Sequence, residues 1–192
     1  MLKNTAAAYG QFAIVLHWLT AALVIGLFSL GLYMTALTYY HPWYHSAPWW
    51  HKSFGLLLFG LLLLRIAWAL YNVKPSPIAS HARWERHLAS ATHRLLYLLL
   101  VLICVSGYLI STAKGEGVEF FGWLVLPALL PGFANQADIA GAAHYYMALA
   151  MIGLVILHTA GALKHHIFDR DETVRRMLCK RRRASHIRGE KA

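Results

Sequence analysis

The stretch "GAAHYYMALAMIGLVILHTAGA", residues 141–162, decides the fold, because it is apolar enough for a membrane interior and yet carries two histidines, His144 and His158. A helix that crosses a bilayer needs about 20 consecutive, mostly apolar residues. Three other segments of the chain also meet that requirement. The predicted spans are residues 12–37, 49–71, 93–111 and 141–163.

The composition supports a membrane protein. Of the 192 residues, 58% are hydrophobic and only 14% are charged, whereas soluble domains have about 25% charged residues. We therefore expect one domain over residues 1–192, an all-α bundle of four transmembrane helices. None of the four spans contains an Asp or Glu, which argues against a proton-coupled pump.

The positive charge is concentrated in particular connections. The tail, residues 164–192, has ten Lys and Arg against four acids, and the connection 72–92 is also basic. The connection 38–48 has no Lys or Arg. Because cytoplasmic loops carry the excess of Lys and Arg, both termini are predicted to be cytoplasmic. Beside four spans, a basic cytoplasmic tail indicates binding to anionic lipid rather than to nucleic acid.

Four histidines fall at two depths of the predicted bundle. His17 lies five residues after the start of the first span, and His158 lies five before the end of the fourth, so both should be near the inner face. His51 and His144 should both be near the outer face. Along one helix, the separation of His144 and His158 is ~21 Å, and the two side chains differ in direction by roughly 40°. The fourth helix should therefore present one imidazole at each level.

Three interpretations of these histidines stay open at this point: axial ligands of two haems, a metal or proton path, and hydrogen-bonded packing residues. Neutral imidazole is a good ligand for iron, and polar groups inside a membrane are costly and usually functional. The chain has no C-x-x-C-H attachment motif, so a haem would be held without thioether bonds. A His-lined metal transporter without redox chemistry is the corresponding non-haem function.

Several motifs, in this order and spacing, resemble the bacterial cytochrome b561 family, whose members are four-helix inner-membrane proteins with two b haems. The similarity extends over residues 9–178. The resemblance implies axial ligands at His17, His51, His144 and His158, with an outer haem between His51 and His144 and an inner haem between His17 and His158. The matching motifs are "VLHWLTA", "WWHKSFG", "FFGWLVLP", "AHYYMA" and "LHTAGALKHHIFDRDETVRRML".

The resemblance also implies a function. Family members carry electrons across the bacterial inner (plasma) membrane and exchange them with the quinone pool, ubiquinone included. One branch is similar to a superoxide oxidase, in which superoxide reduces ubiquinone, and only that activity would make the chain an enzyme. The alternative is a cytochrome b subunit that passes electrons to or from a partner dehydrogenase or a periplasmic redox protein.

Other polar residues of the spans and loops allow two interpretations each. Arg65, fourteen residues after His51, is a candidate partner for a haem propionate, or it extends to the lipid headgroups. His93 is expected to line the inner site without ligating iron. His41 and His45 belong to an aromatic loop that is typical of a membrane interface, or to a lid over the outer site.

The charge asymmetry generates a test of sidedness. Cys179 lies in the basic tail, so a membrane-impermeant thiol reagent applied to intact cells should leave it unlabelled and should label it only after permeabilisation. The measurement is the labelled fraction of Cys179 by mass spectrometry. Strong labelling from outside would invert the topology and exchange the two histidine levels.

Overall fold

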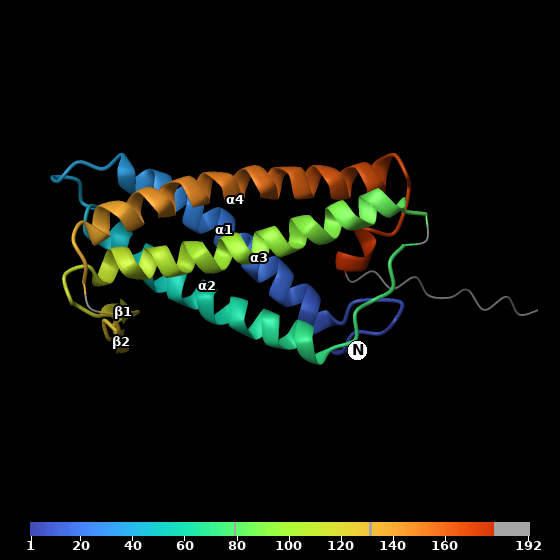
Figure 1. The fold of residues 1–192 in the computed structure, drawn as a ribbon, viewed down its shortest axis with the longest axis horizontal. Coiled ribbons are helices and arrows are strands. Elements are labelled where there is room, and N and C mark those ends of the chain that lie inside the picture. Colours follow the sequence, from blue (N-terminus) through green and yellow to red (C-terminus); the bar gives the residue numbers. More distant parts are fainter. Residues whose placement is uncertain (79, 131, 179–192) are drawn as a thin grey trace, which may run out of the picture.

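The computed structural model describes residues 1–78, 80–130 and 132–178. Four long helices run side by side along the molecule (Figure 1). All four are long and apolar enough to cross a membrane. The helices are α1 (Gln11–Thr35), α2 (Ser46–Tyr71), α3 (Arg83–Thr112) and α4 (Gln136–Ile167).

The bundle has the surface expected of a protein surrounded by lipid. Many large apolar side chains of the helices are exposed, and Leu62 and Leu58 of α2 belong to a small buried core with Leu27, Leu100 and Met151. Helix packing in a membrane depends on close contact rather than on removing apolar surface from water. The prediction of a four-helix membrane protein is thus confirmed.

Helix α3 begins ten residues before the predicted span. Its first turns carry Arg83, Glu85 and Arg86, which keep that segment below the hydropathy of a spanning stretch. The Glu85 carboxylate accepts a hydrogen bond from the backbone N–H of Ala82 at 2.9 Å, a contact that satisfies one free donor at the helix start. The helix therefore extends beyond its apolar part.

A short antiparallel hairpin lies at the opposite end of the bundle from the N-terminus (Figure 1). Strand β1 (Val118–Phe120) pairs with β2 (Leu124–Leu126), with Val118 opposite Leu126. The backbone N–H of Phe121 donates to Ser53 Oγ at 3.1 Å, which fastens the turn onto α2. These strands were not predicted from the sequence.

The N-terminal segment, the α2–α3 connection and the segment after α4 meet at one end of the bundle (Figure 1). Ser76 N–H donates to the carbonyl of Ala6 at 2.8 Å, and Arg176 donates to the carbonyl of Ser76 at 2.8 Å. The 3-10 helix η1 (Arg175–Met177) follows α4 and provides Arg176. The rest of the predicted basic tail, 179–192 with Cys179, lies outside the described residues.

The helices associate most closely as two hairpins, α1 with α2 and α3 with α4. Contacts between the hairpins are fewer, and α1 touches α4 at only a few positions. A cavity of about 560 Å³ lies among the helices, in the half of the bundle that carries the β-hairpin. Two histidines, His51 of α2 and His144 of α4, therefore face a space that the chain itself does not fill.

Candidate functional site

The outer histidines lie on facing helices at the wall of this cavity. The ring centroids of His51 on α2 and His144 on α4 are 6.2 Å apart. Both side chains line the 560 Å³ cavity, which is otherwise mostly apolar. The structure thus brings together the two residues that the sequence places at the outer level.

Backbone and hydroxyl groups of α3 orient His144. Its Nδ1 lies 3.0 Å from the carbonyl oxygen of Ile103 and 3.1 Å from Ser106 Oγ. A carbonyl can only accept, so Nδ1 carries the proton and Nε2 keeps its lone pair. The Ser106 hydroxyl donates to the same carbonyl at 2.9 Å. His144 is therefore held in the tautomer that offers Nε2 to a metal.

Two glycines make room for the outer imidazoles. A Cβ at Gly107 would lie 3.2 Å from His144 Cε1, and one at Gly31 would lie 3.4 Å from His51 Cε1. The first distance is shorter than side chains normally tolerate, so Gly107 lets the His144 ring lie against α3. Within the described part of the chain, the buried Nδ1 of His51 has no hydrogen-bond partner.

The inner level gathers one polar side chain from each helix. The ring centroids of His17 on α1 and His158 on α4 are 6.4 Å apart, and the ring of His93 on α3 is 5.1 Å from that of His158. Arg65 of α2 donates from Nη2 to His17 Nδ1 at 3.0 Å, and its guanidinium lies over the Tyr97 ring at 5.3 Å. Arg65 thus lies at the inner level, as its spacing from His51 suggested.

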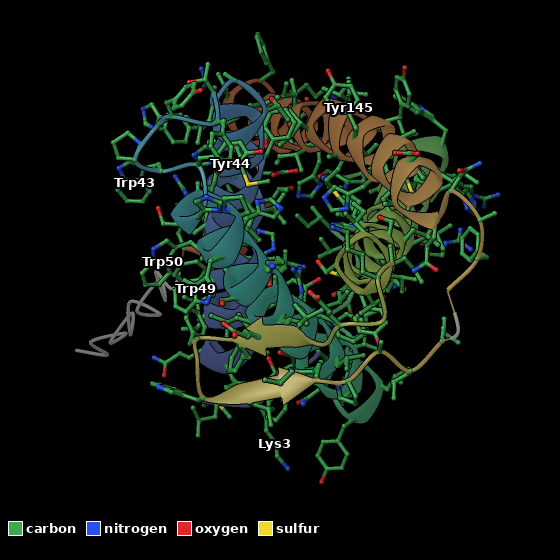
Figure 2. All side chains as sticks on the ribbon, turned by 90° about the vertical axis from the view of Figure 1, so that its left-hand side faces the viewer. Lys3, Trp43, Tyr44, Trp49, Trp50 and Tyr145 are labelled. Carbon is green, nitrogen blue, oxygen red and sulfur yellow. The ribbon has the colours of Figure 1, made fainter. Side chains whose placement is uncertain are left out.

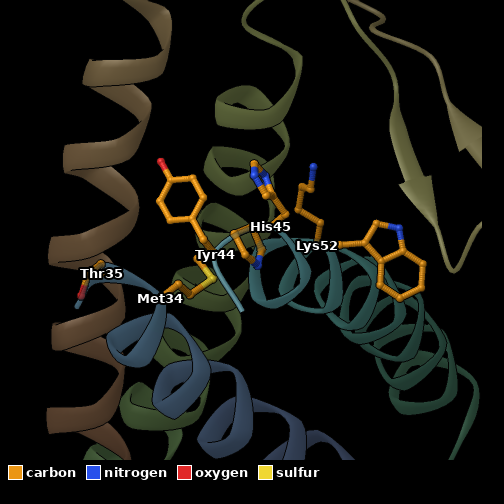
Figure 3. A pocket seen from close by; sticks show the side chains of 7 residues that line it. Met34, Thr35, Tyr44, His45 and Lys52 are labelled. Carbon is orange, nitrogen blue, oxygen red and sulfur yellow. The ribbon is translucent and has the colours of Figure 1, made fainter. Parts of the chain in front are cut away.

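A second pocket opens at the end of the bundle predicted to face outward. It has a volume of about 510 Å³ and is lined by His45, Lys52, Tyr44, Met34, Thr35, Pro48 and Trp49. Figure 3 shows His45 and Lys52 projecting upward from the start of α2, with Tyr44 beside them. Lys52 also lines the larger cavity, so one lysine residue borders both spaces.

Aromatic side chains surround this outer end. Trp43, Trp49 and Trp50 lie together around the start of α2 when the bundle is viewed along its length, and Tyr145 of α4 lies on another side (Figure 2). Trp49 donates to the Glu119 carboxylate of β1 at 3.0 Å. Trp and Tyr are common at membrane interfaces, where an apolar ring and a polar atom are both accommodated. His41 packs against Tyr33 in the same region, with ring centroids 6.1 Å apart.

Sequence reasoning missed the residues that hold the His144 ring in position. Ser106 is an ordinary small residue of an apolar helix, and Gly107 is one of several scattered helical glycines. Only the contact between α3 and α4 identifies them, because they lie 38 and 37 positions before His144. A Ser-Gly pair in an otherwise apolar span was the available signal.

Comparisons with known proteins identify the family of the chain. A model of the prokaryotic cytochrome b561 family matches residues 8–180. The chain is 46% identical over 177 residues to cytochrome b561 homolog 2 of Escherichia coli (strain K12), an alignment that covers 92% of this chain and 94% of the relative.

Two more distant relatives are also similar over most of their length. The probable superoxide oxidase CybB of Yersinia pestis is 30% identical over 91% of this chain and 97% of its own. Cytochrome b561 homolog 1 of E. coli is 26% identical over 69% of this chain and 74% of its own. The chain therefore belongs to the prokaryotic cytochrome b561 family, as a multi-pass bacterial membrane protein of electron transport that binds b-type haem.

Proposed function

We propose that this protein carries electrons across the bacterial inner membrane through two b haems, an outer one between His51 and His144 and an inner one between His17 and His158. The observation that carries the proposal is the pair of histidine separations, 6.2 Å and 6.4 Å between ring centroids. A metal bonded at about 2 Å to a nitrogen of each of two imidazoles separates the ring centroids by roughly 6 Å. Both pairs have this spacing.

The surrounding residues fit the group. At the outer level, the cavity volume is within the range of ligand sites, ~300–1,000 Å³, and the Ile103 carbonyl holds His144 in the tautomer with Nε2 available. A carbonyl that accepts the Nδ1 proton also makes the imidazole a stronger ligand. When bound, each haem supplies one-electron iron chemistry, so that two levels together form a path along the membrane normal.

At the inner level, one hydrogen bond must change. Arg65 donates to His17 Nδ1, yet an imidazole that binds a metal through Nε2 carries its proton on Nδ1 and cannot accept there. A haem held by His17 through Nε2 would therefore require the guanidinium to leave this nitrogen. A released, half-buried Arg65 needs an anionic partner, and a haem propionate is one. His93 lies beside His158 at this site, and we do not count it among the four histidines that bind the two haems.

For the reaction, we propose that superoxide is oxidised at the outer face and ubiquinone is reduced. Two superoxide ions each lose one electron and become O₂, and ubiquinone takes both electrons and two protons to become ubiquinol. The observations behind this proposal are the likeness to a probable superoxide oxidase and the placement of Lys52 in both outer spaces. A cation at the mouth of the cavity attracts an anionic substrate. We also propose that both termini are cytoplasmic and that the basic tail binds anionic lipid.

The haem pairing has a direct spectroscopic test. Substituting either member of a pair by Ala should remove the same haem component, because one axial ligand alone holds a b haem poorly. His51→Ala and His144→Ala should lose one component of the reduced-minus-oxidised spectrum, and His17→Ala and His158→Ala should lose the other. If His51→Ala removed the component that His17→Ala removes, the pairing would be wrong.

The role of Gly107 is tested by adding a side chain. Gly107→Val should displace the His144 ring and lower the content of the outer haem, because even a Cβ would lie 3.2 Å from Cε1. The matched control is Gly153→Val on α4, where a Cβ meets no atom of the described chain within 4 Å. Haem per protein and the two spectral components are measured. Equal outer haem in both variants would remove the steric role of Gly107.

The substrate is tested by stopped-flow reduction of the purified protein with superoxide and, separately, with ubiquinol. Lys52→Ala should slow reduction by superoxide on the order of two- to tenfold, with a weaker dependence on salt, and leave reduction by ubiquinol unchanged. Lys114→Ala, which removes an equal charge from the exposed turn that follows α3, is the control and should have the smaller effect. A protein reduced by ubiquinol alone would favour the role of a cytochrome b subunit serving a redox partner.

A further inference from the structure

A second group of histidines and carboxylates lies outside the haem levels, where the chain leaves α4. It joins His81 of the α2–α3 connection, His165 of the last turn of α4, and Asp171 of the segment that follows. His81 Nε2 is 2.6 Å from Asp171 Oδ2, and His165 Nδ1 is 3.9 Å from the same oxygen. The two imidazoles are stacked with centroids 4.2 Å apart, and the donor atoms of all three residues lie within 4.8 Å of one another.

The backbone positions Asp171 before any ligand arrives. Arg170 has a φ of 53°, in the left-handed region, and so turns the chain back toward α4. The Asp171 N–H then donates to the His165 carbonyl at 3.2 Å. The backbone N–H of Thr173 donates to Asp171 Oδ1 at 2.8 Å, which leaves Oδ2 for the two imidazoles. The Asp171 side chain is only 6% exposed, so this orientation is sheltered from water.

The neighbouring carboxylates already have a cation. Lys164 Nζ lies 2.9 Å from Glu85 Oε1 and 2.7 Å from Asp169 Oδ2, and its hydrogen bond holds the pKa of Asp169 below the ordinary value. Asp169 also contacts His165 Nδ1 at 2.6 Å. If the His165 imidazole leaves Asp169 to bind elsewhere, Asp169 still has its ion pair with Lys164. Asp171 is the carboxylate that faces both imidazoles and has no Lys or Arg among its ion-pair partners in the described chain.

We propose that His81, His165 and Asp171 bind a divalent transition-metal ion, best matched by Zn²⁺. Two imidazoles and one carboxylate are a ligand set that zinc takes with a water molecule in the fourth position, whereas Mg²⁺ and Ca²⁺ prefer oxygen donors throughout. The hydrogen bond between His81 and Asp171 shows that these donors already approach one another within 2.6 Å.

Metal binding replaces that hydrogen bond. The proton between His81 Nε2 and Asp171 goes to solvent, and the nitrogen lone pair and the carboxylate oxygen both turn to the metal. His165 moves closer, because ligands about 2 Å from a tetrahedral zinc ion lie roughly 3.3 Å apart. The ion then connects the α2–α3 connection to the end of α4, at the end of the bundle that holds the N-terminus (Figure 1).

The test uses the haem-loaded full-length protein, equilibrated with micromolar free Zn²⁺ in metal-free buffer and analysed for zinc per chain by mass spectrometry. Wild type should hold one zinc more than Asp171→Asn and one more than His81→Ala. His87→Ala, which removes an exposed histidine from α3, is the matched control and should bind as much as wild type. An unchanged visible haem spectrum in every variant shows that the fold is retained.

Two results would overturn the proposal. Equal zinc content in wild type, Asp171→Asn and His81→Ala would mean that a shared proton, rather than a metal, joins these side chains. Loss of the extra zinc when Mg²⁺ is added in excess would mean an oxygen-ligand site of a different kind. Retention of one zinc by wild type and by His87→Ala in the presence of Mg²⁺ is the supporting result.

Discussion

The structure depends on holding polar imidazole rings among apolar helices. An imidazole between apolar helices needs a hydrogen bond or a metal, because a buried polar atom without a partner destabilises the protein by about 1–3 kcal/mol. His144 has the Ile103 carbonyl on Nδ1, and His17 has Arg65, but the buried Nδ1 of His51 has no partner in the described chain. Helix spacing, the glycines beside the rings and the cavity all follow from holding these groups at fixed positions.

The sequence predicts the four helices well because hydropathy is a local property. The first and last residues of the predicted spans 12–37 and 49–71 lie within three residues of the bounds of α1 and α2. The two histidine levels follow from counting residues along each helix. The start of α3 at Arg83 was not predicted, since a charged helical turn outside the membrane has no hydropathy signal. The two strands were not predicted because each has only three residues, too few to show an alternating pattern.

Much of the candidate site is not local and so could not be predicted. His144 meets Ile103 and Ser106 only because α3 packs along α4, and His81 meets Asp171 across 90 positions. The direction of a helical side chain can be counted from sequence, whereas the pairing of helices and the path of the loops cannot. The resemblance to the family predicts the four histidines as ligands, but it does not say which neighbouring atoms fix each ring.

The arrangement of α1 with α2 and α3 with α4 has a consequence for biogenesis. The two hairpins share few direct contacts, so little of the packing joins one to the other. A haem held as proposed, by His51 from the first hairpin and His144 from the second, would add its binding free energy to their association. Haem supply would then control the assembly of the protein as well as its electron transport, and chains that fail to acquire the cofactor would separate into two hairpins open to membrane proteases.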